Sequence, residues 1–340
     1  MFNNYSEVLL NAKTKLNGVC NICPDCNGLF CKGKIPGVGG KGGGAAFTDA
    51  REYLKSIKIN VDAVHEHFDA DTKIKLLWQD FELPFFVAPI GGMKLNYADV
   101  ITEKDYAFSV IAGAHDAGAL AFTGDGPADE ILTMPLDVIR ETGFKGIATI
   151  KPWEYEKCMG RINMAKDAGS IAIAMDIDSA SLINLKLAGK PVYCKSGEEI
   201  KQIAKAAQIP FIVKGILNEK SAIKCKDAGC YGIVVSNHGG RTVEDAPAPA
   251  SKLREIRAAV GPNFKIFVDG GIRTGADIFK CIALGADAVL IGRPFAIAAI
   301  GGGREGVKML FDKLKAELCE IMLMTNCKTI SDITMDKIIL

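Results

Sequence analysis

Eight short apolar segments, which begin 21 to 40 residues apart, constrain the fold of this chain more than any other feature. They are almost continuously apolar rather than alternating, which is typical of parallel strands buried on both faces. The stretches between them, such as residues 154–169, have helical periodicity and are long enough for a crossover helix each time. The eight segments are FFVAP (85–89), LAFTG (120–124), IATIK (147–151), IAIAMD (171–176), FIVKG (211–215), GIVVSN (232–237), KIFVDG (265–270) and AVLIG (288–292).

Eight strand and helix units in succession predict an α/β fold, a (β/α)8 TIM barrel, with a doubly wound open sheet as the competing architecture. A weak internal repeat supports the barrel, because each copy ends a helix in Ala-Gly or Gly-Ala just before a strand. We expect this barrel domain to span residues 48–340 and a separate Cys- and Gly-rich segment to span residues 1–47. The four copies of the repeat are AHDAG (114–118), AKDAG (165–169), CKDAG (225–229) and ALGAD (283–287).

Residues 1–47 have an unusual composition, with seven glycines between Gly33 and Gly44, which argues against a regular helix or strand there. Just before them, four cysteines fall within twelve residues in a pattern close to the ferredoxin-type run C-x2-C-x2-C-x3-C. They could hold an iron–sulfur cluster or a zinc ion, or they could be redox-active or buried thiols without metal. The candidate metal ligands are Cys20, Cys23, Cys26 and Cys31.

The composition excludes several partners and locations. The chain has 41 Lys and Arg against 40 Asp and Glu, so overall charge gives no reason to expect nucleic acid or an anionic membrane as partner. No apolar run approaches the ~18 residues of a spanning helix, and the first residues do not resemble a signal peptide. We therefore expect a cytoplasmic protein. Its 11 cysteines are expected to be reduced, and the seven outside the cluster to be small buried hydrophobes.

The segments that follow the last two predicted strands favour a phosphate site. Asp269-Gly270-Gly271-Ile272-Arg273 follows one strand and Gly292-Arg293-Pro294 follows the other. The loops after strands seven and eight are the usual phosphate site of such barrels, where glycine N–H groups and forked arginine donors meet the ligand. The alternative is glycine turns with arginines that face solvent.

The ends of the fifth and sixth predicted strands carry candidate chemistry. His238, in Ser236-Asn237-His238-Gly239-Gly240-Arg241, can act as a base near neutral pH. Arg241 can hold a carboxylate through two parallel hydrogen bonds. Lys214 ends an apolar strand, from which it could stabilise an anion or form a Schiff base; the alternative is a snorkelling or salt-bridged lysine.

These segments together resemble the FMN-dependent 2-hydroxy acid dehydrogenase/oxidase family, which includes glycolate oxidase and lactate oxidase. The resemblance is dense from about residue 210 to 327, looser over 85–176 and absent before residue 47, which marks a divergent subgroup with an N-terminal cysteine cluster. It implies that His238 takes the substrate hydroxyl proton while a hydride passes to flavin N5. It also implies that Arg241 binds the substrate carboxylate, that Lys214 stabilises reduced flavin and that Asp176 supports the protonated histidine.

The resemblance also implies a set of FMN-binding residues and a homo-oligomer, with a tetramer as the usual state. The electron acceptor is open: oxygen, a quinone or a protein. The residues expected to contact FMN are Pro89, Ile90, Gly91, Thr123, Lys214, Ser236, Asp269, Gly271, Arg273, Gly292 and Arg293.

Three positions on the substrate side depart from the family. The N-terminal segment has no matching tyrosine, Lys151 replaces a second tyrosine, and Asp125 replaces an aromatic residue. We therefore hypothesise a small anionic substrate with a second anionic group, such as a dicarboxylate, bound by Lys151 and Arg241. In the alternative, Lys151 pairs with Asp125 and touches no substrate.

Other functions are compatible with parts of the sequence. One is an FMN oxidoreductase that acts on a different CH–OH or peptide substrate, and another is a flavin and thiol redox sensor without fast turnover. A type 2 isopentenyl diphosphate isomerase also uses FMN in such a barrel, but it would need neither the base nor the carboxylate clamp.

Overall fold

The eight predicted strands form one closed parallel barrel in the computed structural model, which describes residues 2–340. The strand order is β10-β11-β4-β5-β6-β7-β8-β9, so consecutive units are neighbours all the way round. The (β/α)8 prediction is confirmed, and the open sheet is excluded. The barrel strands are β4 (Phe85–Ile90), β5 (Ala121–Thr123), β6 (Gly146–Ile150), β7 (Ala172–Asp176), β8 (Phe211–Ile216), β9 (Gly232–Val235), β10 (Lys265–Val268) and β11 (Ala288–Ile291).

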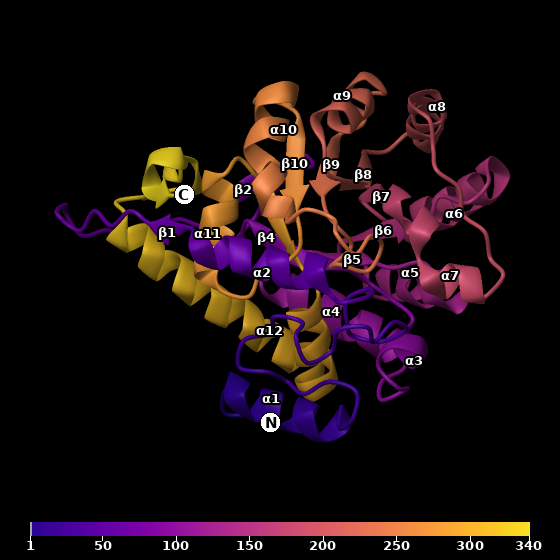
Figure 1. Ribbon diagram of the computed structural model, residues 1–340, viewed down its shortest axis with the longest axis horizontal. Coiled ribbons are helices and arrows are strands. Elements are labelled where there is room, and N and C mark those ends of the chain that lie inside the picture. The colour runs from indigo at the N-terminus through magenta and orange to yellow at the C-terminus, as the bar shows by residue number, and fades with distance from the viewer. Residues whose placement is uncertain (1) are drawn as a thin grey trace.

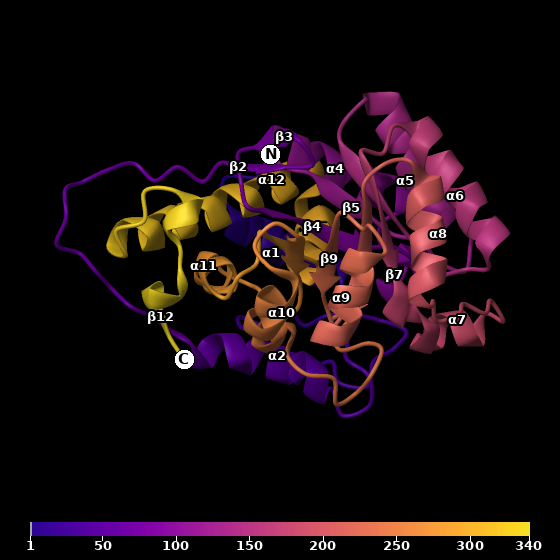
Figure 2. The same ribbon diagram turned by 90° about the horizontal axis from the view of Figure 1, so that it is seen from above.

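Eight helices form the outer layer around these strands (Figure 2). The repeat seen in the sequence marks where four of them end, since Gly118, Gly169, Gly229 and Gly285 all have positive φ and turn the chain into the next strand. The helices are α4 (Glu103–Asp116), α5 (Glu130–Thr142), α6 (Tyr155–Ala168), α8 (Gly197–Ala207), α9 (Glu219–Asp227), α10 (Leu253–Val260), α11 (Gly275–Ala283) and α12 (Arg293–Met324), the last kinked at Gly303.

Short elements complete the fold. α3 follows β4, while η1 and α7 follow β7, so all three stand at the C-terminal mouth of the barrel. None of the helices described within residues 2–340 combines the length and apolar character needed to cross a membrane. The short elements are α3 (Met93–Asn96), α7 (Ile183–Leu187), η1 (Ile177–Ser181), η2 (Pro249–Lys252), η3 (Ile330–Asp332), η4 (Met335–Lys337), the hairpin of β2 (Ile74–Leu76) and β3 (Gln79–Phe81), and the pair of β1 (Lys58–Ile59) and β12 (Ile338–Ile339).

The N-terminal region is more regular than its composition indicates. It forms α1 (Tyr5–Lys15) and the start of α2 (Ala45–Ser56), so the boundary expected between residues 47 and 48 lies inside α2. Residues 33–44 contain neither helix nor strand, as expected. α1 packs along α12 (Figure 1), where the Asn11 side chain donates to the Gly301 carbonyl at 2.5 Å and the Lys15 ammonium to the Ile300 carbonyl at 2.8 Å.

We expect Gly301→Ala to lower the free energy of unfolding by about 1–3 kcal/mol, a typical cost of overpacking. The added methyl group would overlap the Val8 carbonyl oxygen and lie 3.0 Å from Ala12 Cβ, so α1 would have to move off α12. Gly160→Ala in α6 is the control, because a Cβ there meets nothing within 4 Å and alanine favours helix by ~1 kcal/mol. Urea unfolding of both variants measures the effect. A Gly301→Ala variant as stable as the wild type would contradict the packing of α1 against α12.

Candidate active site

An open cavity with about 1150 Å³ of empty space lies at the C-terminal mouth of the barrel. Its position is that of active sites in this fold, and the space, which includes the open mouth, is large enough for a ligand. Thr123 and Ser236, which were expected to contact a cofactor, are buried behind its wall instead. The Ser236 hydroxyl accepts hydrogen bonds from Lys214 and from the His238 N–H, which cover it. The predicted residues that line the cavity are Pro89, Ile90, Gly91, Lys151, Asp176, Lys214, His238, Arg241, Asp269, Gly271, Arg273, Gly292 and Arg293.

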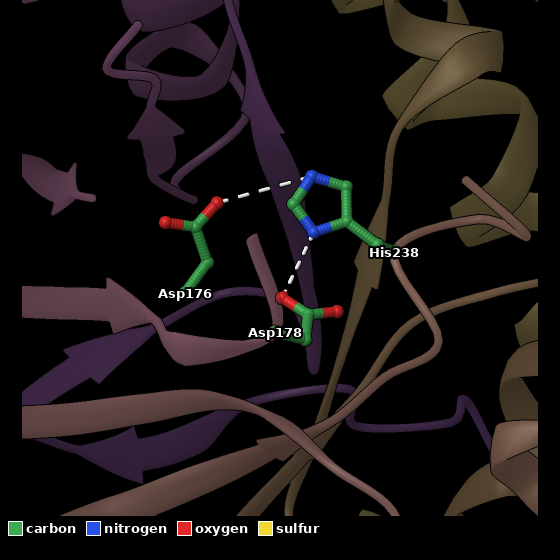
Figure 3. A group of neighbouring side chains, drawn as sticks. All are labelled: Asp176, Asp178 and His238. Atoms are coloured by element: carbon green, nitrogen blue, oxygen red, sulfur yellow. Dashed lines mark hydrogen bonds and ion pairs between the residues drawn. The ribbon is translucent and has the colours of Figure 1, made fainter. Parts of the chain in front are cut away.

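The candidate base lies between two aspartates (Figure 3). His238 Nδ1 is 2.9 Å from Asp178 Oδ1, whereas its Nε2 is 3.8 Å from Asp176 Oδ2. The hydrogen-bond partner is thus Asp178, which sequence reasoning missed, and not the predicted Asp176. Both carboxylates belong to the MDID segment, but only the 3-10 turn η1 after β7 brings the second one back to the imidazole.

The surroundings of His238 keep its ring neutral. Burial lowers the pKa of His238 well below its ordinary value, and the nearby Lys214 and Lys151 ammonium groups lower it further, while Asp176 opposes them. A neutral imidazole that donates Nδ1–H to Asp178 keeps its lone pair on Nε2. His238 has φ 56°, and the next two glycines also have positive φ, so a left-handed turn aims the ring. This is the protonation state that a general base requires.

The Lys151 ammonium forms an ion pair with the carboxylate of Asp176. Its Nζ lies 2.6 Å from Asp176 Oδ2, and both side chains are buried. The alternative that Lys151 pairs with Asp125 through its charge is wrong, because the Asp125 carboxylate accepts instead from Arg161, the Trp153 indole and the Lys151 backbone N–H. Asp176 therefore neutralises Lys151 rather than bonding the histidine.

Arg241, by contrast, has no counter-ion among the residues that the structure describes. One guanidinium N–H group donates to Asn96 Oδ1 at 2.8 Å, its buried Nε has no partner, and no carboxylate among residues 2–340 pairs with it. Burial, with a contribution from the Arg293 charge, lowers the pKa of Arg241 to about 10. A buried cation without a counter-ion is costly, so the cavity is suited to an anionic ligand at this point.

Lys214 supplies a second fixed charge on the cavity wall. Its Nζ donates to Ser236 Oγ at 2.9 Å and lies 3.3 Å from Asp269 Oδ2. Burial alone would lower the pKa of Lys214, but the carboxylates of Asp269, Asp178 and Asp176 raise it above its ordinary value. Lys214 therefore stays charged, which excludes the free amine that Schiff-base formation would need.

The predicted phosphate end has the expected glycines and arginines, but the N-terminal segment covers it. Arg293 donates to the Val38 and Gly39 carbonyls at 2.7 and 3.1 Å and stacks on the Phe47 ring, 3.9 Å from its centroid. Gly271 must be glycine, because its φ is +80° and a Cβ would overlap the backbone carbonyl of α2. Neither Arg293 nor Arg273 forms a salt bridge with any residue from 2 to 340, and both are half-buried and donate to backbone carbonyls rather than extending into solvent, which argues against the solvent-facing alternative.

Several residues on the cavity wall were not predicted, because they lie on α3, β6 and α7 rather than at strand ends rich in charge. Asn96 accepts from Arg241 and also from the Asn184 amide at 3.3 Å, so it links two of the covering helices. Burial raises the pKa of Tyr97 to about 12, so its hydroxyl stays protonated. The further wall residues are Leu95, Asn96, Tyr97, Thr149, Leu182, Asn184 and Leu185.

The four clustered cysteines line a second cavity, and their metal-binding role stays a prediction. Within residues 2–340, the one close group of three potential metal ligands is Asp176, Asp178 and His238. The Asp176 carboxylate in this group is already paired with the Lys151 ammonium. Of the other seven cysteines, five are buried as expected, but Cys319 is half-buried and Cys194 is exposed.

Known flavin-dependent hydroxy acid oxidases are similar to this chain in sequence and in fold. A profile described as FMN-dependent dehydrogenase matches residues 192–340. An L-lactate oxidase of Roseobacter sp. is 28% identical over 335 residues, 88% of each chain. An L-lactate oxidase of Lactobacillus jensenii is 30% identical over 297 residues, 77% of this chain and 70% of that one. The crystal structure of a mandelate oxidase with 3,3-difluoro-2-hydroxy-3-phenylpropionic acid superposes with a TM-score of 0.79 at 26% identity, over 98% of this chain and 97% of that one.

Proposed function

The chain belongs to the FMN-dependent 2-hydroxy acid dehydrogenase/oxidase family, and from this premise we propose which substrate it oxidises and by which residues. It is an FMN-dependent oxidoreductase of α-hydroxy acids. We assign as its substrate a 2-hydroxy acid with one carboxylate and an apolar side chain. The observation that carries this proposal is a partly buried arginine that no carboxylate among residues 2–340 pairs with, beside a neutral, aspartate-bonded histidine in one cavity.

The residues of the cavity fit FMN. Arg273 and Arg293, which have no carboxylate partner among residues 2–340, offer positive charge where a phosphate would lie. Gly271 and Gly292 leave the backbone accessible there. Lys214, whose ammonium is held on the cavity wall by Ser236 and Asp269, would stabilise negative charge on reduced flavin. Bound FMN supplies the hydride acceptor that the side chains themselves lack.

The protein side chains then bind the substrate and move its proton. Arg241, supported by Asn96, would bind the carboxylate through charge-assisted hydrogen bonds. His238 Nε2 would accept the hydroxyl proton as the hydride leaves C2. Asp178, bonded to Nδ1, would stabilise the imidazolium that forms. Asp176, at 3.8 Å from Nε2 and paired with Lys151, would limit how far the ring can turn.

The proposal that the substrate has one carboxylate rather than two follows from the ion pair that Lys151 forms with Asp176. A second anionic group would need a free cation, but the Lys151 charge is already neutralised by Asp176. Apolar side chains from α3, from α7 and from the residue before α7 also line the cavity, namely Leu95, Leu185 and Leu182. This proposal replaces the dicarboxylate hypothesis that the sequence favoured. L-lactate oxidases and the mandelate oxidase, whose names give monocarboxylic acids, are consistent with it.

Anaerobic titration of the purified protein with lactate, mandelate, 2-hydroxyoctanoate and malate tests the proposal. We expect the monocarboxylates to bleach the flavin absorption and malate to require a concentration at least tenfold higher. A preference for malate would overturn the assignment of one carboxylate. Bound FMN that none of these acids reduces would favour the redox sensor or a peptide substrate. The acceptor and the homo-oligomer stay predictions.

The pH dependence offers a separate prediction. Lys151→Met removes one of the cations that lower the His238 pKa and leaves Asp176, which raises it, without its partner. Because His238 must be neutral to accept a proton, activity falls as the pH drops through its pKa. The acidic limb of kcat/KM is therefore expected at higher pH in Lys151→Met than in the wild type.

The matched control is Lys157→Met, whose ammonium stacks over the Trp153 ring outside the cavity. Its acidic limb should coincide with that of the wild type. If the limb of Lys151→Met also stayed in place, the base would not be His238.

A further inference from the structure

The four N-terminal cysteines surround a single cavity that is separate from the active site. It holds about 1100 Å³ of empty space. All four thiols line it, and none of them forms a disulfide or is fully exposed. The rest of its wall is largely apolar and comes from α1, α12 and the segment itself. The thiol residues are Cys20, Cys23, Cys26 and Cys31, and the apolar wall includes Tyr5, Leu9, Ile22, Phe30, Ile297 and Leu310.

The segment that carries these thiols is fixed on the barrel. The Cys20 N–H donates to the Leu16 carbonyl at the end of α1, at 2.9 Å. Asp25, between the second and third cysteines, forms an ion pair of 2.8 Å with Arg51 of α2. Arg51 in turn pairs with the buried Asp277 of α11 at 2.9 Å. The thiols are thus positioned by packed elements rather than by a loose terminal arm.

The spacing of the thiols does not suit one ion. In a tetrahedral zinc site, sulfurs 2.3 Å from the metal lie only about 3.8 Å apart. Among residues 2–340, the group of ligand atoms close enough to hold one ion is that of Asp176, Asp178 and His238, and the four cysteine sulfurs do not form such a group. An iron–sulfur cluster occupies the space between its four thiolates and therefore needs them further apart around an open volume. The four thiols here line one open cavity, which fits such a cluster better than a single ion.

Charge on the wall favours an anionic group in this cavity. Arg273 lies against Cys26, with Nη2 3.6 Å from the thiol sulfur and Nε 3.1 Å from the carbonyl oxygen. It has no carboxylate partner among the described residues, whereas Arg51 and Lys313 on the same wall are paired with Asp25 and Glu317. A cluster with four thiolate ligands is anionic, so Arg273 would be its counter-ion.

Arg273 also places this cavity next to the flavin site, because it lines both cavities. We propose that Cys20, Cys23, Cys26 and Cys31 bind a [4Fe–4S] cluster that serves as the one-electron outlet of the flavin. The proposal that the cysteines bind a cluster is independent of the proposed function. The proposal that the cluster accepts electrons from the flavin rests on the proposed function. Oxidation of CH–OH to C=O releases two electrons and two protons. The cluster is reduced and reoxidised twice per turnover, passing single electrons to a one-electron carrier protein, while the protons leave to solvent.

Metal analysis of the anaerobically reconstituted full chain tests the site. We expect about four iron and four sulfide per chain, and at least a twofold loss of both in Cys23→Ser with an unchanged FMN content. The control Cys194→Ser changes an exposed thiol outside the cavity and should keep the wild-type values. One zinc without sulfide, no metal at all, or equal iron and sulfide in Cys23→Ser would each overturn the site. The wild-type content decides the matter even if Cys23→Ser does not fold.

Light-driven reduction of bound FMN, with EDTA as donor, tests the outlet without any hydroxy acid. We expect the electron paramagnetic resonance signal of a reduced cluster to grow in the wild type as the flavin is reduced, and to be absent in Cys23→Ser. If dithionite reduces the cluster but the cluster stays oxidised when light reduces the flavin, the role as electron outlet is overturned, whereas the cluster site is not. Because neither experiment uses the substrate, failure of the proposed function cannot imitate these results.

Discussion

His238→Gln is expected to slow the reduction of bound flavin by a 2-hydroxy acid by about 10²–10⁴-fold, the usual contribution of a general base. Glutamine can still donate to Asp178, but it has no basic nitrogen for the substrate proton. The rate is measured in a single turnover by stopped-flow absorption without oxygen. FMN content and thermal stability should remain close to wild type, since the side-chain volume and the bond to Asp178 are largely kept.

His67→Gln is the control for this variant, because His67 is exposed and lies far along the chain from the barrel mouth. Its flavin should be reduced at the wild-type rate. A His238→Gln variant that reduces flavin within about threefold of the wild type would show that another group removes the proton. In that event Asp176, 3.8 Å from the ring, would be the next residue to substitute.

Arg241→Met is expected to raise KM for the 2-hydroxy acid by about 10- to 100-fold, the equivalent of one lost charge-assisted hydrogen-bonded pair of ~1.5–3 kcal/mol. The physical reason is that Arg241 is the cation near His238 without a carboxylate partner among the described residues. The stability of the ligand-free protein should hold or rise, because a buried charge without counter-ion is removed. Steady-state kinetics and urea unfolding give the two values.

Arg254→Met, an exposed position on α10, is the control and should leave both KM and stability unchanged. The combination of higher KM and undiminished stability is what distinguishes a binding role for Arg241 from a structural one. A variant with unchanged KM but lower stability would mean that Arg241 serves the fold through Asn96 alone.

The sequence predicted the barrel and its functional end because two simple periodic signals point the same way. Strands covered on both faces must be apolar throughout, so FIVKG and its seven counterparts are visible without alignment. The carboxyl ends of parallel strands all meet at one mouth. Polar residues that end such strands, including Lys214 and His238, therefore had to lie close together, as they do.

Elements outside this periodicity were less accessible. α1 was not predicted, although Tyr5–Lys15 contains neither cysteine nor glycine, because the Cys- and Gly-rich residues 18–44 set the expectation for the whole segment. The helix is stabilised by packing against α12, far along the chain. Asn96 and Tyr97 were missed because they reach the cavity from a single turn of helix after β4, which has no charge pattern.

The sequence by itself thus determined the architecture and the family, and it indicated His238 and Arg241 as the candidate base and carboxylate-binding residue. Only the tertiary structure decided which charges are partners: Asp178 with His238, Asp176 with Lys151, and no carboxylate with Arg241. The physical reason is that Coulomb energy and hydrogen bonding depend on distances of a few ångströms. Those distances are set by turns such as η1 and by burial, so residue order alone leaves several pairings equally plausible.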